Sequence, residues 1–124
     1  MGSGGRIEHL LNEDKRFKKR VNYNLDIHYP RVNNKSVYKD YTTDKPLMEV
    51  INISETGICF KSRVPLTEGD FVNFTLTLED NPSFWCLAEV KWVKKEDELY
   101  YSGCEFFTLT WEQKNIIKNF VNKQ

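Results

Sequence analysis

Residues 21–29 read VNYNLDIHY, and this stretch decides the fold class. Apolar or aromatic side chains alternate with polar ones, at Val21, Tyr23, Leu25, Ile27 and Tyr29. Successive side chains of a strand point to opposite faces, so a period of two predicts a half-buried β-strand. The strand is expected to end at the proline that follows, because proline lacks the N–H that a sheet requires.

Further strand-like segments follow toward the C-terminus. Segments rich in β-branched and aromatic residues are separated by turn residues such as PLTEGD, NP and KEDE. The expected strands are 47–54, 57–62, 71–79, 84–93 and 99–107, with a possible short strand at 36–42.

The last segment has the pattern of a helix instead. Thr110 precedes it and Gln113 lies three residues later, which is the spacing of a capping box. Its apolar stripe consists of Ile116, Ile117, Phe120 and Val121. Many short strands followed by one helix predict an antiparallel barrel or sandwich with the helix lying on it.

Composition limits the function. The chain has 124 residues, enough for one domain, and its 18 basic and 18 acidic residues give zero net charge. An attraction of the whole surface for nucleic acid or acidic lipid is not expected, so an anion site must be local. No apolar run is long enough to insert into a membrane. Cys59, Cys86 and Cys104 have no paired spacing and are expected to be buried, reduced thiols of a cytoplasmic protein without a metal site.

The N-terminal part is expected to be separate from the barrel. Residues 1–5, MGSGG, resemble the remnant of an expression tag. Residues 6–20 are expected to form a flexible arm, and residues 21–124 to form the domain. Within the arm, RIEHLLNE could make one or two helical turns with Ile7, Leu10 and Leu11 on one side.

A basic run, KRFKKR at 15–20, closes this arm. Arg16 and Arg20 are four residues apart, a spacing that puts them on one side of a strand or helix. Two guanidinium groups there can make forked hydrogen bonds to phosphate or to a guanine edge, which lysine cannot copy. The alternative is a solvated charge run with no ligand.

A second polar stretch, NISETG at 52–57, lies inside an apolar strand segment. Asn52 and Ser54 are expected on the outer face, with Ile51 and Ile53 toward the core. Gly57 offers either a positive φ or room for close backbone approach. The alternative is a polar hairpin turn in which Asn and Ser bond their own backbone.

Together, RFKKR in the form RxxxR and NISETG in the form [D/N]xSxxG resemble the PilZ domain family. LTEGDFVNF, GCEF and the capped helix continue this resemblance over about residues 14–121. It implies a six-stranded antiparallel β-barrel with a C-terminal helix, and the bacterial second messenger cyclic di-GMP as ligand.

The resemblance also implies the roles of single residues. Arg16 and Arg20 would hold phosphate and guanine, Asn52 and Ser54 would bond guanine or ribose-phosphate atoms, and Gly57 would allow close approach. Lys15 and Lys19 complete the expected ligand-binding set. Lys15 stands where some family members have an arginine linked to a stacked ligand pair, so one or two bound nucleotides are both open.

Three functions follow as hypotheses, none of them enzymatic, because no nucleophile–base pair, phosphate loop or metal signature is present. The first is a cyclic di-GMP receptor whose arm changes conformation and alters contacts with a protein partner or neighbouring domain, without a further cofactor. The second is a PilZ-like interaction module that binds no nucleotide. The third, a barrel that binds single-stranded nucleic acid, is disfavoured by the zero net charge and by Trp85, Trp92 and Trp111, which are expected in the core.

Overall fold

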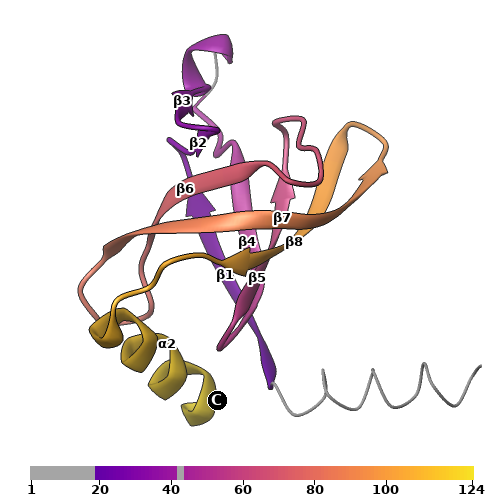
Figure 1. Ribbon diagram of the computed structural model, residues 1–124. Helices are drawn as coiled ribbons and strands as arrows, with labels where there is room; N and C mark the ends of the chain where they lie inside the picture. Colours follow the sequence, from indigo (N-terminus) through magenta and orange to yellow (C-terminus); the bar gives the residue numbers. More distant parts are fainter. Residues whose placement is uncertain (1–18, 42–43) are drawn as a thin grey trace, which may run out of the picture.

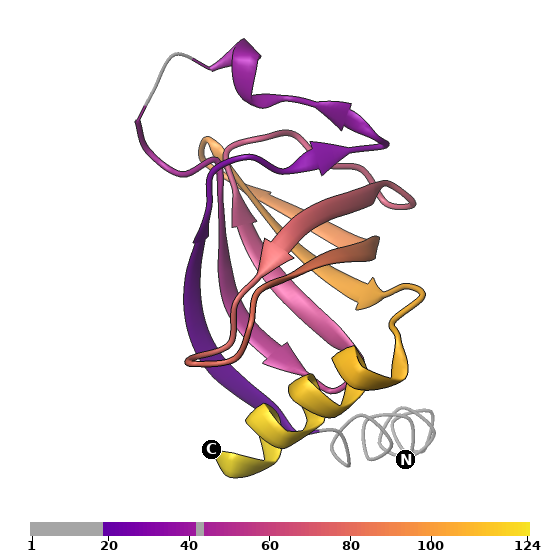
Figure 2. The same cartoon turned by 90° about the vertical axis from the view of Figure 1, so that its left-hand side faces the viewer.

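The fold is a curled antiparallel sheet with a helix across one end (Figures 1 and 2). A computed structural model describes residues 19–41 and 44–124. In order, its elements are β1 (Arg20–Ile27), β2 (Arg31–Val32), β3 (Lys35–Ser36), the 3-10 helix η1 (Tyr38–Asp40), β4 (Met48–Ser54), β5 (Gly57–Ser62), β6 (Phe71–Leu76), β7 (Phe84–Glu96), β8 (Leu99–Phe106) and α2 (Trp111–Lys123).

The strand order across the sheet is β1-β4-β5-β8-β7-β6-β2-β3. Six of these strands are long, and β2 and β3 have two residues each, so the six expected antiparallel strands are present with a short extra hairpin. The sheet curls into a half-barrel, with α2 at one end and β2 and β3 at the other (Figure 2). The possible strand at 36–42 is wrong, because Tyr38–Asp40 form a 3-10 helix after β3.

The core lies in the hollow of the half-barrel. Val72, Phe74, Leu76 and Leu78 are all fully buried, as their period of two predicted. Phe60 reaches the same core from β5 and packs edge-on against Phe74, with ring centroids 4.9 Å apart. The alternation in β1 holds as far as its last residue, whereas Tyr29 lies beyond the strand and is 69% exposed.

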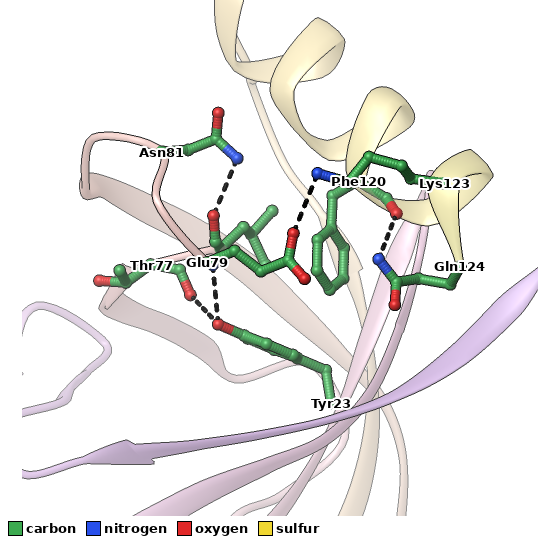
Figure 3. Close-up of polar contacts among 8 residues, drawn as sticks. Tyr23, Thr77, Glu79, Asn81, Phe120, Lys123 and Gln124 are labelled. Atoms are coloured by element: carbon green, nitrogen blue, oxygen red, sulfur yellow. Dashed lines mark hydrogen bonds and ion pairs between the residues drawn. The ribbon is translucent and has the colours of Figure 1, made fainter.

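Tyr23 ties β1 to the β6–β7 connection and to α2 (Figure 3). Its hydroxyl donates to the Thr77 carbonyl over 2.8 Å and accepts from the Glu79 N–H over 3.0 Å. The edge of its ring contacts Phe120 of α2, with centroids 4.8 Å apart. The Glu79 carboxylate also pairs with Lys123 at 3.1 Å, so this connection is held from both sides.

Helix α2 begins with the predicted capping box. The Gln113 N–H donates to the Thr110 hydroxyl over 3.1 Å, and the Thr110 N–H donates to the Gln113 side chain over 3.0 Å. Ile117, Phe120 and Val121 are buried against the barrel, and Ile116 is half-buried. Within the described ranges no helix has the length and apolar character needed to cross a membrane.

Candidate functional site

Pairing of β1 with β4 brings the described parts of the two polar motifs together. Arg20 lies opposite Ser54, and Asn22 lies opposite Asn52. The Arg20 guanidinium donates from Nη1 to Asn52 Oδ1 over 2.7 Å. The Asn52 amide of the NISETG motif therefore orients Arg20 of the RFKKR motif, although the two residues are 32 positions apart in the sequence.

Bulges set which side chains of β4 face outward. Val50 pairs with Phe60 and Asn52 pairs with Cys59, so β4 has one more residue than β5 at this point. Ile51 is consequently half-buried rather than in the core, which corrects the expectation for that residue, whereas Ile53 is fully buried as predicted.

The sequence predicts Ser54 on the outer face beside Asn52, and this prediction is wrong. Ser54 is buried, with only 1% of its surface exposed. Its hydroxyl accepts from the Gly57 N–H over 3.1 Å and from the Thr56 N–H over 3.4 Å. It also lies 3.4 Å from the Gly57 carbonyl, to which it donates. For Ser54, the alternative of a side chain that closes its own hairpin turn describes what the structure shows.

Gly57 provides close approach rather than a positive φ. Gly69 is the glycine with positive φ in the described chain, and Gly57 starts β5 in an extended conformation. A Cβ at Gly57 would stand 2.7 Å from the backbone oxygen of Cys104 on β8, which is shorter than any normal contact. The glycine therefore lets β5 and β8 come together beneath the Arg20 guanidinium, whose Nη2 is 3.6 Å from the same point.

A groove of about 580 Å³ opens over these residues. Its walls include Arg20 and Ser54, Cys59 of β5, Lys91 and Trp92 of β7, and Gly103 and Glu105 of β8. This size falls within the range usual for small-molecule sites in proteins.

Trp92 forms the aromatic wall of this groove, and it is 50% exposed. A Cβ at Gly103 would stand 1.9 Å from Trp92 Nε1, so the indole lies directly against this glycine. The prediction that the tryptophans are core residues is wrong, because Trp85 is 51% exposed and Trp111 is 78% exposed. Trp92 is the functional candidate that sequence reasoning missed.

A bulge explains why Trp92 faces outward. Val90 pairs with Cys104 and Trp92 pairs with Gly103, so Lys91 is an extra residue in β7. Strict alternation from buried Val90 would turn Trp92 inward, and the inserted residue turns it outward instead. The outward position of Trp85 requires no bulge, because Trp85 precedes buried Cys86 and regular alternation already places it on the outer face.

The groove has both basic and acidic groups. Arg20 and Lys91 supply positive charge, and Glu105 supplies a carboxylate. A hydrogen bond from Lys91 to Glu89, 3.2 Å long, raises the pKa of the lysine and keeps it charged. The site therefore offers a guanidinium, an ammonium and an indole face to an anion with aromatic parts.

Cys59 also lines this groove, and its sulfur lies 3.5 Å from Arg20 Nη1. Burial raises the pKa of this thiol, and the nearby Arg20 partly offsets the increase. All three cysteines are free thiols. The sequence predicts that Cys59 is buried, whereas the structure shows it half-buried.

The other two cysteines are buried, and burial raises the pKa values of Cys86 and Cys104 to about 12. Within residues 19–41 and 44–124 no three metal-ligating side chains cluster.

Three predicted site residues remain, namely Lys19, Lys15 and Arg16. The Lys19 ammonium contacts the backbone oxygen of Gln124 at the end of α2, and Lys19 is not among the residues that line the groove. Lys15 and Arg16 lie outside the described residues, so their part in the site stays a prediction.

A model of the PilZ domain family matches residues 14–123, nearly the whole chain and both motifs. The chain belongs to the PilZ family. PilZ domains are binding modules rather than enzymes, and they are typically receptors for cyclic di-GMP.

A solved structure with this fold is that of the Bacillus subtilis inhibitor of motility, MotI/DgrA, with a TM-score of 0.64 and 13% sequence identity. The match covers 86% of this chain and 49% of that protein, so this PilZ domain spans about half the length of its structural neighbour. No curated protein sequence matches the chain significantly.

Proposed function

We propose that this PilZ domain is a receptor for cyclic di-GMP. The observation that carries the proposal is the Arg20–Asn52 contact at the wall of the groove, which joins the two ligand motifs of the family. Cyclic di-GMP carries two phosphodiester charges and two guanine bases, so it needs both a cation and a flat apolar surface.

The groove residues suit each part of that ligand. The Arg20 guanidinium can fork to phosphate oxygens or to the O6 and N7 of guanine. The half-exposed Trp92 indole, on the same groove, offers a face on which a base can stack. Asn52 holds Arg20 in place and can itself bond the ligand, whereas Ser54 contributes mainly through the turn that it closes.

Signalling then requires a change that a partner can detect. Arg16 belongs to the same RxxxR motif and precedes the start of β1, so a ligand that Arg20 holds is within reach of the N-terminal arm. Ordering of this arm over the ligand would change the surface offered to a protein partner or a neighbouring domain. The structural neighbour is an inhibitor of motility, which supports a protein partner for this domain as well.

Calorimetric titration with cyclic di-GMP tests the proposal. The unchanged protein should bind one or two nucleotides, and Arg16→Ala, Arg20→Ala and Asn52→Ala should each weaken binding. Loss of a charge-assisted contact costs about 1.5–3 kcal/mol, which is roughly tenfold or more in affinity. Arg31→Ala is the matched control, because Arg31 lies on β2 and its side chain bonds the Asn34 carbonyl rather than a residue of the groove.

Three results would count against the receptor function. Unchanged affinity in all three variants would separate binding from the two motifs. Absence of any heat with the unchanged protein would leave the interaction module that binds no nucleotide. A gel shift with RNA that cyclic di-GMP does not compete away would instead favour single-stranded nucleic acid.

A further inference from the structure

A second groove lies beside the one that Arg20 and Trp92 line, between the β4–β5 turn and α2. Its volume is about 610 Å³, and it shares Thr56 and Glu105 with the first groove. Phe106, Leu109 and Trp111 supply its apolar wall. Trp111 is 78% exposed, more than any other large apolar side chain in the described ranges, so this wall lacks a cover there.

The helix side of this groove is basic as well as aromatic. Trp111, Lys114 and Lys118 follow one another at helical spacing and form one stripe of α2. Both lysines are exposed, and neither forms a salt bridge with a residue of the described ranges. A segment that covers this stripe should therefore have apolar residues flanked by carboxylates.

The N-terminal arm contains such a segment. Residues 6–14 read RIEHLLNED and lie outside the described residues. Ile7, Leu10 and Leu11 have the spacing of one helical face, and three acidic residues, Glu8, Glu13 and Asp14, accompany them. The segment thus has the apolar and charged character that the groove lacks.

The point where the chain enters the barrel places this segment within reach. Arg20 pairs with Ser54 just before the β4–β5 turn, and Lys19 contacts Gln124 at the end of α2. The described chain therefore enters β1 close to the turn that forms one side of the groove, and close to the C-terminal end of the helix that forms the other side. The 13 residues of α2 span about 20 Å at 1.5 Å per residue, and the eight Cα–Cα steps from residue 11 to residue 19 reach roughly 26 Å when extended.

We propose that residues 6–14 of the same chain dock in this groove, with Leu10 and Leu11 against Trp111 and the acidic residues beside Lys114 and Lys118. The docked segment continues into the basic run and places Arg16 near Thr56 and Glu105, which both grooves share. Docking requires no nucleotide, so it goes beyond the proposed receptor function and is tested without it.

Limited proteolysis of the full chain without nucleotide tests the docking. Trypsin cleaves after Lys15, Arg16 and Lys18, and the docked segment slows that cleavage. Trp111→Ala should speed it roughly tenfold, the change expected from uncovering one buried aliphatic side chain. Trp85→Ala is the matched control, because Trp85 is exposed to 51% on β7 and does not line this groove. Equal rates in the two variants would overturn the proposal.

A second measurement uses variants that leave the barrel untouched. The variant with both Leu10→Ser and Leu11→Ser should speed cleavage as Trp111→Ala does. Adding Trp111→Ala to this double serine variant should speed cleavage little further. In amide NMR spectra the double serine variant should shift residues 105–118. Shifts confined to residues 6–20, or shifts that appear only as protein concentration rises and so place the segment on a second copy, would overturn docking within one chain.

Discussion

Replacing Gly103 by alanine tests the aromatic wall of the groove beside Arg20 with a single methyl group. The new Cβ would stand 1.9 Å from Trp92 Nε1 and 2.3 Å from Cε2. Non-bonded heavy atoms prefer roughly 3.5 Å or more, so the indole must move by about 1.6 Å or swing away. Gly103 lies in β8 without a positive φ, so the alanine backbone itself is not strained.

The expected loss of stability follows from the burial of the indole. Trp92 is 50% exposed, and a tryptophan buries about 150–250 Å² when covered, so about 100 Å² is at stake. At about 25 cal/mol per Å², full displacement costs up to about 2.5 kcal/mol. Alanine in a strand gains about 0.5–1 kcal/mol over glycine, which leaves a net loss of roughly 1.5–2 kcal/mol.

The effect of Gly103→Ala on the free energy of unfolding should change sign when the Trp92 indole is absent. In a Trp92→Ala background, Gly103→Ala meets an open space and should raise the free energy of unfolding by about 0.5–1 kcal/mol. Urea unfolding followed by circular dichroism measures all four proteins. Calorimetry should show that either single change weakens cyclic di-GMP binding, by the ~1–3 kcal/mol of one base stack, and that the double change is no worse. Additive losses in stability would refute the placement of Trp92 on Gly103.

Three further predictions follow from single contacts. Gly57→Ala should cost about 1–3 kcal/mol of stability, measured by urea unfolding, because its Cβ would meet the Cys104 backbone oxygen at 2.7 Å and backbone cannot move as a side chain can. Tyr23→Phe should cost about 1–2 kcal/mol in the same assay, since the Glu79 N–H loses its acceptor and the volume hardly changes. Cys59 should be the first thiol that iodoacetamide alkylates. Because burial raises the pKa of Cys59, its alkylation rate at pH 7 should lie below that of a free thiol and rise about tenfold per pH unit. Cyclic di-GMP should slow the alkylation of Cys59. Alkylation of Cys86 before Cys59 would contradict this prediction.

The sequence predicts the strands and the helix well because each has a local signal. The buried face of β6 follows strict alternation, and the capping box marks the start of α2 within one residue. The 3-10 helix at Tyr38–Asp40 is not predicted because the alternating pattern there is short. The pattern puts Tyr29 on the core face because the alternation continues for two residues beyond the end of the strand at Ile27.

The site is predictable only in part, because its side chains depend on pairing between distant strands. Motif order was enough to bring Arg20 and Asn52 into one hypothesis, and the β1–β4 register places them in contact. The separate roles of Asn52 and Ser54 could not be read from spacing. Both lie on β4 two residues apart, but one meets a guanidinium and the other is covered by its own turn.

Three bulges lie in the strands around the groove beside Arg20, and two of them decide which side chains face it. One lies in β1 between Asn22 and Leu25, one in β4 before Asn52, and one in β7 before Trp92. The extra residues in β4 and β7 turn the side chains beyond them to the other face, whereas the alternation of β1 continues through its bulge. A regular sheet with the same sequence would turn the Trp92 indole into the core and leave the groove without its aromatic wall. The groove residues therefore depend on irregular pairing, which costs ladder hydrogen bonds and is maintained by the buried core beneath it.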